Sequence, residues 1–313
     1  MKSNEVLVTG GAGFIGSKLA ARFAQEGYKV FVIDDLSTGF ETNVPSDCEF
    51  IPLDLTDSSR FGRIAGIKPK YILHLAGQSS GEISFDDPVN DLRLNSISTL
   101  NLLNHFRSFG IHRFGYASSM SVYGDSGINP VDENYKNQPL SCYGISKLAS
   151  EQYLAVYSKN IPFTSFRMFN VYGPGQDFSN MRQGMVSIYL SQAITNKRII
   201  VKGSLERFRD FIYVDDVTDI WFKSLTNGYF KNSPVNVGTG KKTTVKELLE
   251  EISVFFPEIN CEVVGNTKGD QYGIYADPRF LLQKIGSSKF TNINEGLQRT
   301  IDSIRSNRKL EDL

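Results

Sequence analysis

The sequence has 313 residues, of which 40 % are apolar and 22 % charged, and its 34 basic and 34 acidic side chains cancel. A neutral chain of ordinary globular composition is not typical of a general nucleic-acid or membrane-surface binder. At about 150 residues per domain, the length predicts two domains.

The cysteines and apolar runs indicate where the chain resides. Cys48, Cys142 and Cys261 are an odd number at wide spacing, without a CxxC pair or a Cys/His cluster. This pattern predicts neither a disulfide framework nor a metal site, and it favours a reducing, cytoplasmic compartment. We also expect no secretion signal and no membrane span, because no apolar run approaches ~20 residues.

The first third of the chain alternates between apolar β-branched runs and helical patterns. Strands are predicted at residues 5–9, 29–33, 48–52, 71–75 and 113–117, and helices at 16–26 and 92–109. Strands separated by helices indicate βαβ units with right-handed crossovers. The predicted fold class is therefore α/β, with a doubly wound parallel sheet.

Beyond about residue 165 this alternation weakens, because segments rich in Gly, Pro and Asn, such as 170–180, interrupt it. We expect a first domain over residues 1–165 and a smaller C-terminal α/β domain over 166–313. The run from Asp210 to Val214 has the pattern of one more buried strand, followed by a helix. Residues 209–228 are therefore expected to return to the first domain.

Three glycines lie between the first predicted strand and the first helix, at the spacing GxxGxxG: Gly10, Gly13 and Gly16. Glycines here allow a tight turn, close approach of a pyrophosphate to the backbone, and close packing of the helix on the sheet. The anion then faces the helix N-terminus. Because the motif alone is weak, a simple tight turn is the alternative. In its βα context it predicts a dinucleotide site on a Rossmann-type sheet.

The second predicted strand ends at Asp34, 18 residues after Gly16. An acid near this distance accepts hydrogen bonds from the ribose hydroxyls of the adenosine half of a dinucleotide. A 2′-phosphate would meet the like charges of Asp34 and Asp35, with no arginine beside them. The sequence therefore favours NAD over NADP. The alternative for Asp34 is a turn or helix-cap residue.

A tyrosine and a lysine are spaced to share one helix face. Tyr143 and Lys147 are four residues apart, and Ser118 and Ser119 end the fifth predicted strand. A nearby ammonium favours the phenolate, so Lys147 is expected to lower the pKa of Tyr143 and make it a usable acid or base. An isolated Tyr–Lys pair is more often a surface pair. Strand ends in a doubly wound sheet are where ligands bind, which favours a catalytic set.

With these residues in place, the chain resembles the extended short-chain dehydrogenase/reductases, in the branch of NAD-dependent nucleotide-sugar epimerases and dehydratases. The motifs that carry the resemblance lie in order over most of the chain, at residues 10–16, 34–39, 54–55, 74–78, 95, 118–124, 143–147, 167–174 and 209–216. The resemblance implies that NAD is the cofactor and that the second domain binds a nucleotide-diphosphate sugar.

The resemblance also implies roles for individual residues. The catalytic residues would be Ser119, Tyr143 and Lys147. The cofactor would contact Gly10, Gly13, Phe14, Ile15, Gly16, Asp34, Asp35, Ser37, Thr38, Gly39, Asp54, Leu55, Leu75, Ala76, Gly77, Gln78, Asn95, Ser118, Tyr143 and Lys147. The substrate would contact Ser80, Ser119, Asn170, Arg209 and Asp270.

Departures from the family pattern narrow the chemistry. Relatives that eliminate water or carbon dioxide carry an acidic residue just after the catalytic Ser/Thr, whereas this chain has Met120 and Ser121. The resemblance therefore implies a 4-epimerase of the UDP-glucose or UDP-N-acetylglucosamine type, acting through a transient 4-keto sugar. Lys268 stands where relatives often have a second diphosphate-binding arginine, which leaves the nucleotide open.

Three alternatives remain. A nucleotide-sugar 4-ketoreductase would use the same residues but consume NADH or NADPH. A 4,6-dehydratase is disfavoured by Met120, and a non-catalytic dinucleotide-binding protein by the intact Ser119, Tyr143 and Lys147. The resemblance also implies a homodimer, paired through the helix of Tyr143 and the helix predicted over 92–109.

Overall fold

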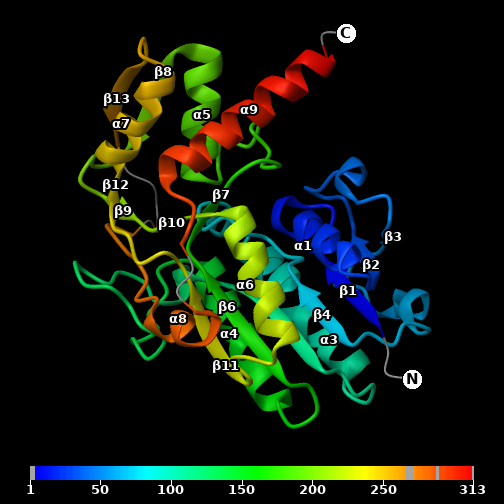
Figure 1. Cartoon of the computed structure of the whole chain (residues 1–313). Helices are drawn as coiled ribbons and strands as arrows, with labels where there is room; N and C mark the ends of the chain where they lie inside the picture. The colour runs from blue at the N-terminus through cyan, green and yellow to red at the C-terminus, as the bar shows by residue number, and fades with distance from the viewer. Residues whose placement is uncertain (1–3, 266–268, 270, 287–288, 312–313) are drawn as a thin grey trace. The chain divides into compact units, whose positions relative to one another are not determined.

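The computed structural model describes residues 4–265, 269, 271–286 and 289–311 (Figure 1). The chain forms two compact units. The first comprises the residues up to Gly124 together with Lys136–Met168 and Thr218–Val235, and the second comprises Asp125–Tyr135, Phe169–Val217 and the residues from Asn236 onward.

The elements follow one another closely along the chain. The strands are β1 (Glu5–Thr9), β2 (Lys29–Asp34), β3 (Glu49–Pro52), β4 (Tyr71–His74), β5 (Arg113–Ser119), β6 (Phe163–Met168), β7 (Asn170–Tyr172), β8 (Arg198–Lys202), β9 (Phe208–Arg209), β10 (Phe211–Tyr213), β11 (Ser233–Val237), β12 (Thr243–Thr244) and β13 (Asn260–Val264). The α-helices are α1 (Phe14–Gln25), α2 (Pro88–Leu92), α3 (Ser98–Phe106), α4 (Cys142–Tyr157), α5 (Met185–Asn196), α6 (Val214–Thr226), α7 (Val245–Phe255), α8 (Arg279–Ile285) and α9 (Ile293–Glu311).

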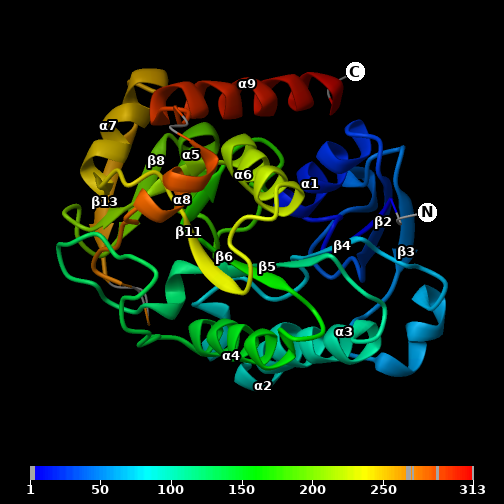
Figure 2. The same ribbon diagram turned by 60° about the horizontal axis from the view of Figure 1, so that its bottom comes forward.

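The main sheet has the strand order β11-β6-β5-β4-β1-β2-β3. The pairings from β3 to β6 are parallel. From β1 the chain adds β2 and β3 on one side of the sheet, and it then crosses over to add β4, β5 and β6 on the other side of β1. Figure 2 shows α2, α3 and α4 along one face of this sheet, with α1 and α6 on the other. The predicted α/β fold with a doubly wound, Rossmann-type parallel sheet is confirmed.

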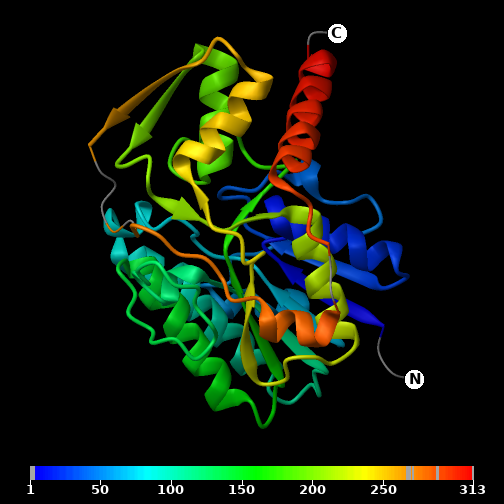
Figure 3. The same ribbon diagram turned by 60° about the vertical axis from the view of Figure 1, so that its left-hand side comes forward.

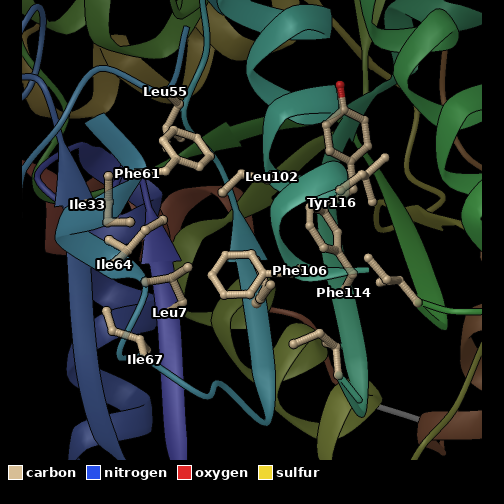
Figure 4. Packing of buried hydrophobic residues seen from close by; sticks show 14 of the residues in the cluster. Leu7, Ile33, Leu55, Phe61, Ile64, Ile67, Leu102, Phe106, Phe114 and Tyr116 are labelled. Carbon is tan, nitrogen blue, oxygen red and sulfur yellow. The ribbon is translucent and has the colours of Figure 1, made fainter. Parts of the chain in front are cut away.

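The face covered by α3 and α4 buries a continuous apolar cluster. Leu7, Ile72 and Phe114 contribute from neighbouring strands, and Leu102 and Phe106 contribute from α3. Figure 4 shows Phe106 among side chains of this cluster that come from other elements. Burying apolar surface supplies most of the driving force for such a layer.

On the opposite face, α1 and α6 pack together. Phe23 of α1 and Phe222 of α6 have ring centroids 5.1 Å apart, and Trp221 stacks on Phe166 of β6 at 4.1 Å. An added Cβ at position 115 would lie 3.0 Å from the Trp221 ring, which is tighter than an ordinary van der Waals contact. Gly115 of β5 therefore lets α6 lie close on the sheet.

The second unit has its own core. β8 pairs in parallel with β13, and Figure 3 shows these two strands beside α5 and α7. Apolar residues of α5, α7 and α9 meet in one cluster, with Leu190, Leu248 and Leu297 fully buried. Short pairs, β7 with β10 and β9 with β12, complete the strands of this unit.

The units can be compared with the predicted domain limits. The predicted boundary after residue 165 lies three residues before Met168, where the first unit gives way to the second. The predicted return over 209–228 overlaps the observed return at Thr218–Val235. Residues 209–217 lie in the second unit, because β10 pairs with β7 rather than with the main sheet. The segment 125–135 also belongs to the second unit, where Val131 bridges Ala276.

The helix predicted over 92–109 differs in its start and its regularity. It begins earlier, at Pro88, where the Asp87 side chain accepts a hydrogen bond from the Asn90 amide. This is the common pairing of an acidic cap with proline in the first turn. The helix is then interrupted by a π-helical turn, η4 (Arg93–Ile97), before α3.

Phe106→Ala is expected to lower the free energy of unfolding by about 3–5 kcal/mol, because it opens a cavity in the cluster of the main sheet. Phe106 is fully buried, whereas the next residue, Arg107, is exposed. Arg107→Ala, as the control, should change this free energy by less than about 0.5 kcal/mol. Urea unfolding followed by circular dichroism measures both. Equal losses for the two variants would contradict this assignment of the core.

Candidate active site

The glycine loop and the loop after β4 emerge side by side from the sheet. β1 pairs with β4, with Thr9 opposite His74, so the two loops begin in register. Gly10 has a positive φ of 68°, and a Cβ there would lie 2.6 Å from the Ala76 amide nitrogen. A Cβ on Gly16 would lie 2.1 Å from the Gly10 carbonyl oxygen. Backbone approaches this close explain why the loop needs glycines.

The start of α1 leaves room for an anion. α1 begins at Phe14 after Gly13, which supplies no side-chain cap, and its first turn carries no acidic residue. Backbone N–H groups at a helix N-terminus, together with the helix dipole, attract negative charge. Phe14 and Ile15, also expected at the cofactor, are half-buried in this first turn.

Asp34 at the end of β2 secures the glycine loop. Its two carboxylate oxygens accept hydrogen bonds from the Ala12 amide at 3.0 Å and the Leu36 amide at 2.9 Å. Burial raises the pKa of this carboxyl, and the two backbone donors oppose the shift. Since each carboxylate oxygen has two acceptor positions, Asp34 keeps capacity for a ligand hydroxyl.

The three predicted catalytic residues lie together in the first unit. Ser119 ends β5, and Tyr143 and Lys147 follow one another on the buried face of α4, as their spacing predicted. The Ser119 hydroxyl acts on Tyr143 as a polar neighbour that lowers the pKa of the phenol. The Lys147 ammonium lies 5.6 Å from the centroid of the Tyr143 ring.

Burial sets the protonation of this group. It raises the pKa of Tyr143 to about 12 and lowers that of Lys147 to about 8. The expected fall in the pKa of Tyr143 is therefore wrong for the chain without bound ligands. There the loss of solvent outweighs other effects, and the nearby Asp91 charge disfavours the phenolate further.

A buried hydrogen-bonded chain runs behind the two loops. Thr99 donates to the Asn95 carbonyl at 2.6 Å, so its oxygen accepts from His74 Nε2 at 2.9 Å. Nδ1 of His74 is then the acceptor for the Thr9 hydroxyl at 2.7 Å, and Thr9 in turn accepts from the Ala76 amide. Burial lowers the pKa of His74 to about 3, which keeps the ring neutral. His74 is thus a fully partnered core residue.

Several other predicted cofactor residues lie on the same edge of the first unit. Ser37, Thr38 and Gly39 follow Asp35, whose carboxylate accepts from the Ser37 amide and hydroxyl. Leu75, Ala76, Gly77 and Gln78 form the loop after β4. Asn95 is buried in the π-helical turn, with its side-chain oxygen unpartnered.

Four predicted residues have structural partners of their own. Asp54 accepts from the Thr56 amide and hydroxyl, and the Leu55 side chain packs in the apolar cluster of the sheet. The Ser80 hydroxyl accepts from the Ile83 amide. Ser118 donates to Glu151 at 2.5 Å, beside a buried Glu151–Arg167 ion pair. The Ser118 side chain is therefore engaged with α4.

The predicted substrate residues after residue 168 lie in the second unit. Asn170 pairs with Phe211, and its amide donates to the Asp210 carbonyl at 3.0 Å. The Arg209 guanidinium donates to the carbonyls of Phe208 and Gln271, both at 2.7 Å. Burial and the neighbouring Arg207 lower the pKa of Arg209 to about 10, so it stays charged at neutral pH. Asp270, like Lys268, lies outside the described residues.

The family model described as the NAD dependent epimerase/dehydratase family matches residues 6–238, which contain the glycine loop and the three predicted catalytic residues. The chain belongs to this family. The match covers most of the chain, and it makes NAD the cofactor of the family site described above.

Three similar proteins place the chain within this epimerase/dehydratase family. UDP-glucose 4-epimerase of Mycolicibacterium smegmatis is 35 % identical, with 96 % of this chain and 98 % of the relative covered. UDP-glucuronic acid decarboxylase 1 of Danio rerio is 30 % identical, with 95 % and 71 % covered. The crystal structure of Thermotoga maritima UDP-glucose 4-epimerase with UDP-glucose has a TM-score of 0.92 and 31 % identity, with 97 % and 99 % covered.

The residues present fit NAD. The start of α1 has no side-chain cap, Gly10 and Gly16 leave no room for a Cβ, and the two acids that follow one another at the end of β2, Asp34 and Asp35, would repel the extra phosphate of NADP. Within the described ranges, no group of three or more His, Cys, Asp or Glu side chains is arranged to hold a metal ion. Over those same ranges, no helix has the length and apolar character of a membrane span.

Sequence reasoning missed Asp91, a buried acid that accepts hydrogen bonds from both Gln78 and Asn95. Its signal was its position four residues before Asn95, which sets the two side chains on one helix face. This spacing alone does not predict that the Asp91 side chain is buried.

Gly16→Ala should weaken NAD binding by more than about tenfold and lower the melting temperature, since its methyl group would displace the backbone of Gly10. Gly62→Ala is the matched control, because an added Cβ there meets nothing within 4 Å. Isothermal titration with NAD and thermal unfolding measure both effects. Unchanged NAD affinity in the Gly16 variant would contradict the placement of the cofactor loop.

Proposed function

We propose that this chain is an NAD-dependent nucleotide-sugar 4-epimerase of the UDP-glucose or UDP-N-acetylglucosamine type, acting through a transient 4-keto sugar. The observation that carries the proposal is the Ser119–Tyr143–Lys147 group together with the residues that follow Ser119. The Ser121 amide and hydroxyl lie 3.1 Å and 3.2 Å from Ser119 Oγ. A hydroxyl, not a carboxyl, thus adjoins the catalytic serine.

This detail favours epimerisation over the other reactions of the family. Elimination of water or loss of carbon dioxide needs an additional acid or base beside the sugar, and in the family pattern it follows the catalytic Ser/Thr directly. Met120 cannot exchange a proton, and Ser121 is a poor acid at neutral pH. An epimerase needs only one group that removes and returns the proton of the C4 hydroxyl.

The residues of the chain have distinct tasks in this reaction. Tyr143 as its phenolate accepts the C4 hydroxyl proton, becomes a phenol and later returns the proton to the C4 oxygen, while the Ser119 hydroxyl would hold that oxygen. The positive charge of Lys147, together with the positive charge that bound NAD would add, favours the phenolate that Tyr143 needs before it can accept this proton. NAD, when bound, supplies a reversible hydride acceptor. We propose that it is held by the glycine loop, Asp34 and the loop after β4.

The second unit would hold the nucleotide diphosphate. Arg209 stays charged although it is buried, and a guanidinium matches the paired oxygens of a phosphate. Asn170 lies on the strand beside it, since β7 pairs with β10. Binding of the diphosphate would retain the 4-keto sugar while the hexose turns to present its other face.

Purified protein without added cofactor, incubated separately with UDP-glucose and UDP-N-acetylglucosamine, tests the proposal. We expect the matching galacto-sugar to form with no net change in absorbance at 340 nm. If neither sugar is converted, but NADH or NADPH is consumed once a nucleotide-linked 4-keto sugar is supplied, the protein is a 4-ketoreductase. A 4-keto or decarboxylated product from UDP-glucose or UDP-glucuronic acid would equally refute the epimerase.

Tyr143→Phe should reduce kcat at least ~100-fold, because it removes the proton-transferring hydroxyl while leaving the ring packed. Tyr153→Phe on the same helix is the control, since Tyr153 is partly exposed on the outer face of α4. Both variants should bind NAD as the parent does, measured by isothermal titration. Full activity in Tyr143→Phe would remove Tyr143 from the mechanism.

We also propose that the protein is a homodimer. Exposed apolar side chains lie along the two helical segments for which the resemblance implied pairing: Val89, Leu92 and Ile97 on α2 and η4, and Ile145, Tyr153 and Val156 on α4. Val89 and Val156 are 69 % and 77 % exposed. Apolar side chains grouped on neighbouring helices are typical of a surface that a second copy covers.

Val89→Glu/Val156→Glu should convert the dimer to a monomer, because like charges would be buried against each other at the interface. Val254→Glu is the control, since Val254 is 68 % exposed on α7, in the second unit. Size-exclusion chromatography with light scattering measures the mass of each. A dimeric double variant, or a monomeric parent, would contradict this interface.

A further inference from the structure

One buried carboxylate beside the catalytic set has no task in the mechanism above. Asp91 on α2 is only 1 % exposed. Its Oδ1 accepts hydrogen bonds from Gln78 Nε2 at 2.9 Å and Asn95 Nδ2 at 3.1 Å. Its Oδ2 accepts from Ser146 Oγ at 2.7 Å. Such donors are what an ionised carboxylate needs to be buried at acceptable cost.

These partners come from three different segments. Gln78 is in the loop after β4, Asn95 is in the π-helical turn, and Ser146 is on α4, immediately before Lys147. Asn95 Nδ2 also lies 3.1 Å from Ser146 Oγ, which closes the group. A single side chain thus ties the predicted sugar-facing loop to the helix that carries Tyr143 and Lys147.

The Asp91 carboxylate also acts electrostatically on Lys147. The titratable groups around Lys147 include Asp91 on α2, His74 on β4, Tyr116 on β5, and Tyr143 and Glu151 on α4. His74 is neutral, and burial raises the pKa of Tyr116 as it does that of Tyr143. Burial raises the pKa of the Asp91 carboxyl, and its hydrogen bonds and the charge of Lys147 oppose that rise. Glu151 is paired with Arg167, so Asp91 is the acid that raises the pKa of Lys147.

We propose that Asp91 is a positioning residue of the proposed active site: its carboxylate fixes Gln78, Asn95 and Ser146 and acts as the buried counter-charge of Lys147. The assignment of Lys147 to catalysis rests on the proposed function, whereas the electrostatic interaction of Asp91 with Lys147 does not.

The negative charge of Asp91 has opposite effects on Lys147 and Tyr143: it favours the charged form of the first and disfavours the charged form of the second. A negative charge raises the pKa of Lys147, so that the ammonium persists although it is buried. The same charge disfavours the Tyr143 phenolate. Asp91 therefore keeps Lys147 protonated at neutral pH and postpones ionisation of Tyr143 until ligands add positive charge. Without it, burial would drive Lys147 to lose its proton at a lower pH.

Asp91→Asn removes the charge and retains the shape. The new amide can donate to Ser146 Oγ, whose proton can turn to the Tyr143 carbonyl, 3.0 Å away. The Lys147 ammonium is followed by NMR in 15N-lysine-labelled, ligand-free protein and assigned by its absence in Lys147→Met. We expect its titration midpoint to fall by about one pH unit or more from that of the parent. A midpoint within 0.3 units of the parent, as an approximate limit of such a titration, would overturn the proposal.

Ser146→Ala is the matched control, since it removes one hydrogen bond of Asp91 without removing charge. It should lower the melting temperature and leave the Lys147 midpoint in place. A residue with a merely structural role would instead give the same result in both variants, a loss of stability with no shift.

If Asp91→Asn does not fold, the reciprocal measurement decides. Coupling between two charges acts equally on both, so Lys147→Met must raise the midpoint of the Asp91 carboxyl, followed by 13C NMR. An unchanged Asp91 midpoint would overturn the proposal. Neither titration requires turnover, so a protein that fails to epimerise any sugar can still confirm the Asp91–Lys147 pair.

The epimerase assay adds a separate readout. Where the protein is active, the alkaline limb of the pH profile of kcat should move to lower pH in Asp91→Asn, parallel to the Lys147 midpoint. A limb that stays in place while the NMR midpoint moves would show that the protonation of Lys147 does not limit turnover.

Discussion

The register of β1 against β4 is the constraint on which the site depends. It sets Thr9 opposite His74, so the glycine loop and the loop after β4 leave the sheet at the same height and are close enough for Gly10 to contact Ala76. His74 then links Thr9 to Thr99 and the π-helical turn. A slip of one residue would reverse the side-chain faces of β1 and break each of these contacts.

Several buried charged side chains surround α4. Lys147 lies over the ring of Tyr116 on β5, and Glu151 and Arg167 form a bidentate buried pair next to Ser118. Removing one partner from such a pair leaves an uncompensated charge, which is far more costly than the pair itself. The face of α4 that carries the catalytic residues is thus held by polar contacts, while the apolar cluster along the same helix begins only at Leu154.

Much of this could be predicted from the sequence, because its signals are local. Strand runs, the glycine spacing and the four-residue interval from Tyr143 to Lys147 each reflect a geometry fixed within a few residues. The role of Asp91 and the raised pKa of Tyr143 depend on which distant segments surround them, and no spacing encodes this. The β10 strand shows the same limit, since its apolar pattern indicated a strand but not its partner β7.

His74 is neutral and both of its ring nitrogens are hydrogen-bonded, which makes the stability of the fold sensitive to acid. Its pKa falls from about 6.5 in an unfolded chain to about 3 in the fold, so between these values only the unfolded chain takes up a proton at this ring. Acidification through this range therefore draws the equilibrium toward unfolding, while the imidazole of the native protein keeps its form. Alkaline conditions act in a different place, on the ammonium of Lys147. Low pH therefore favours unfolding, whereas high pH removes the proton of Lys147 in the folded protein.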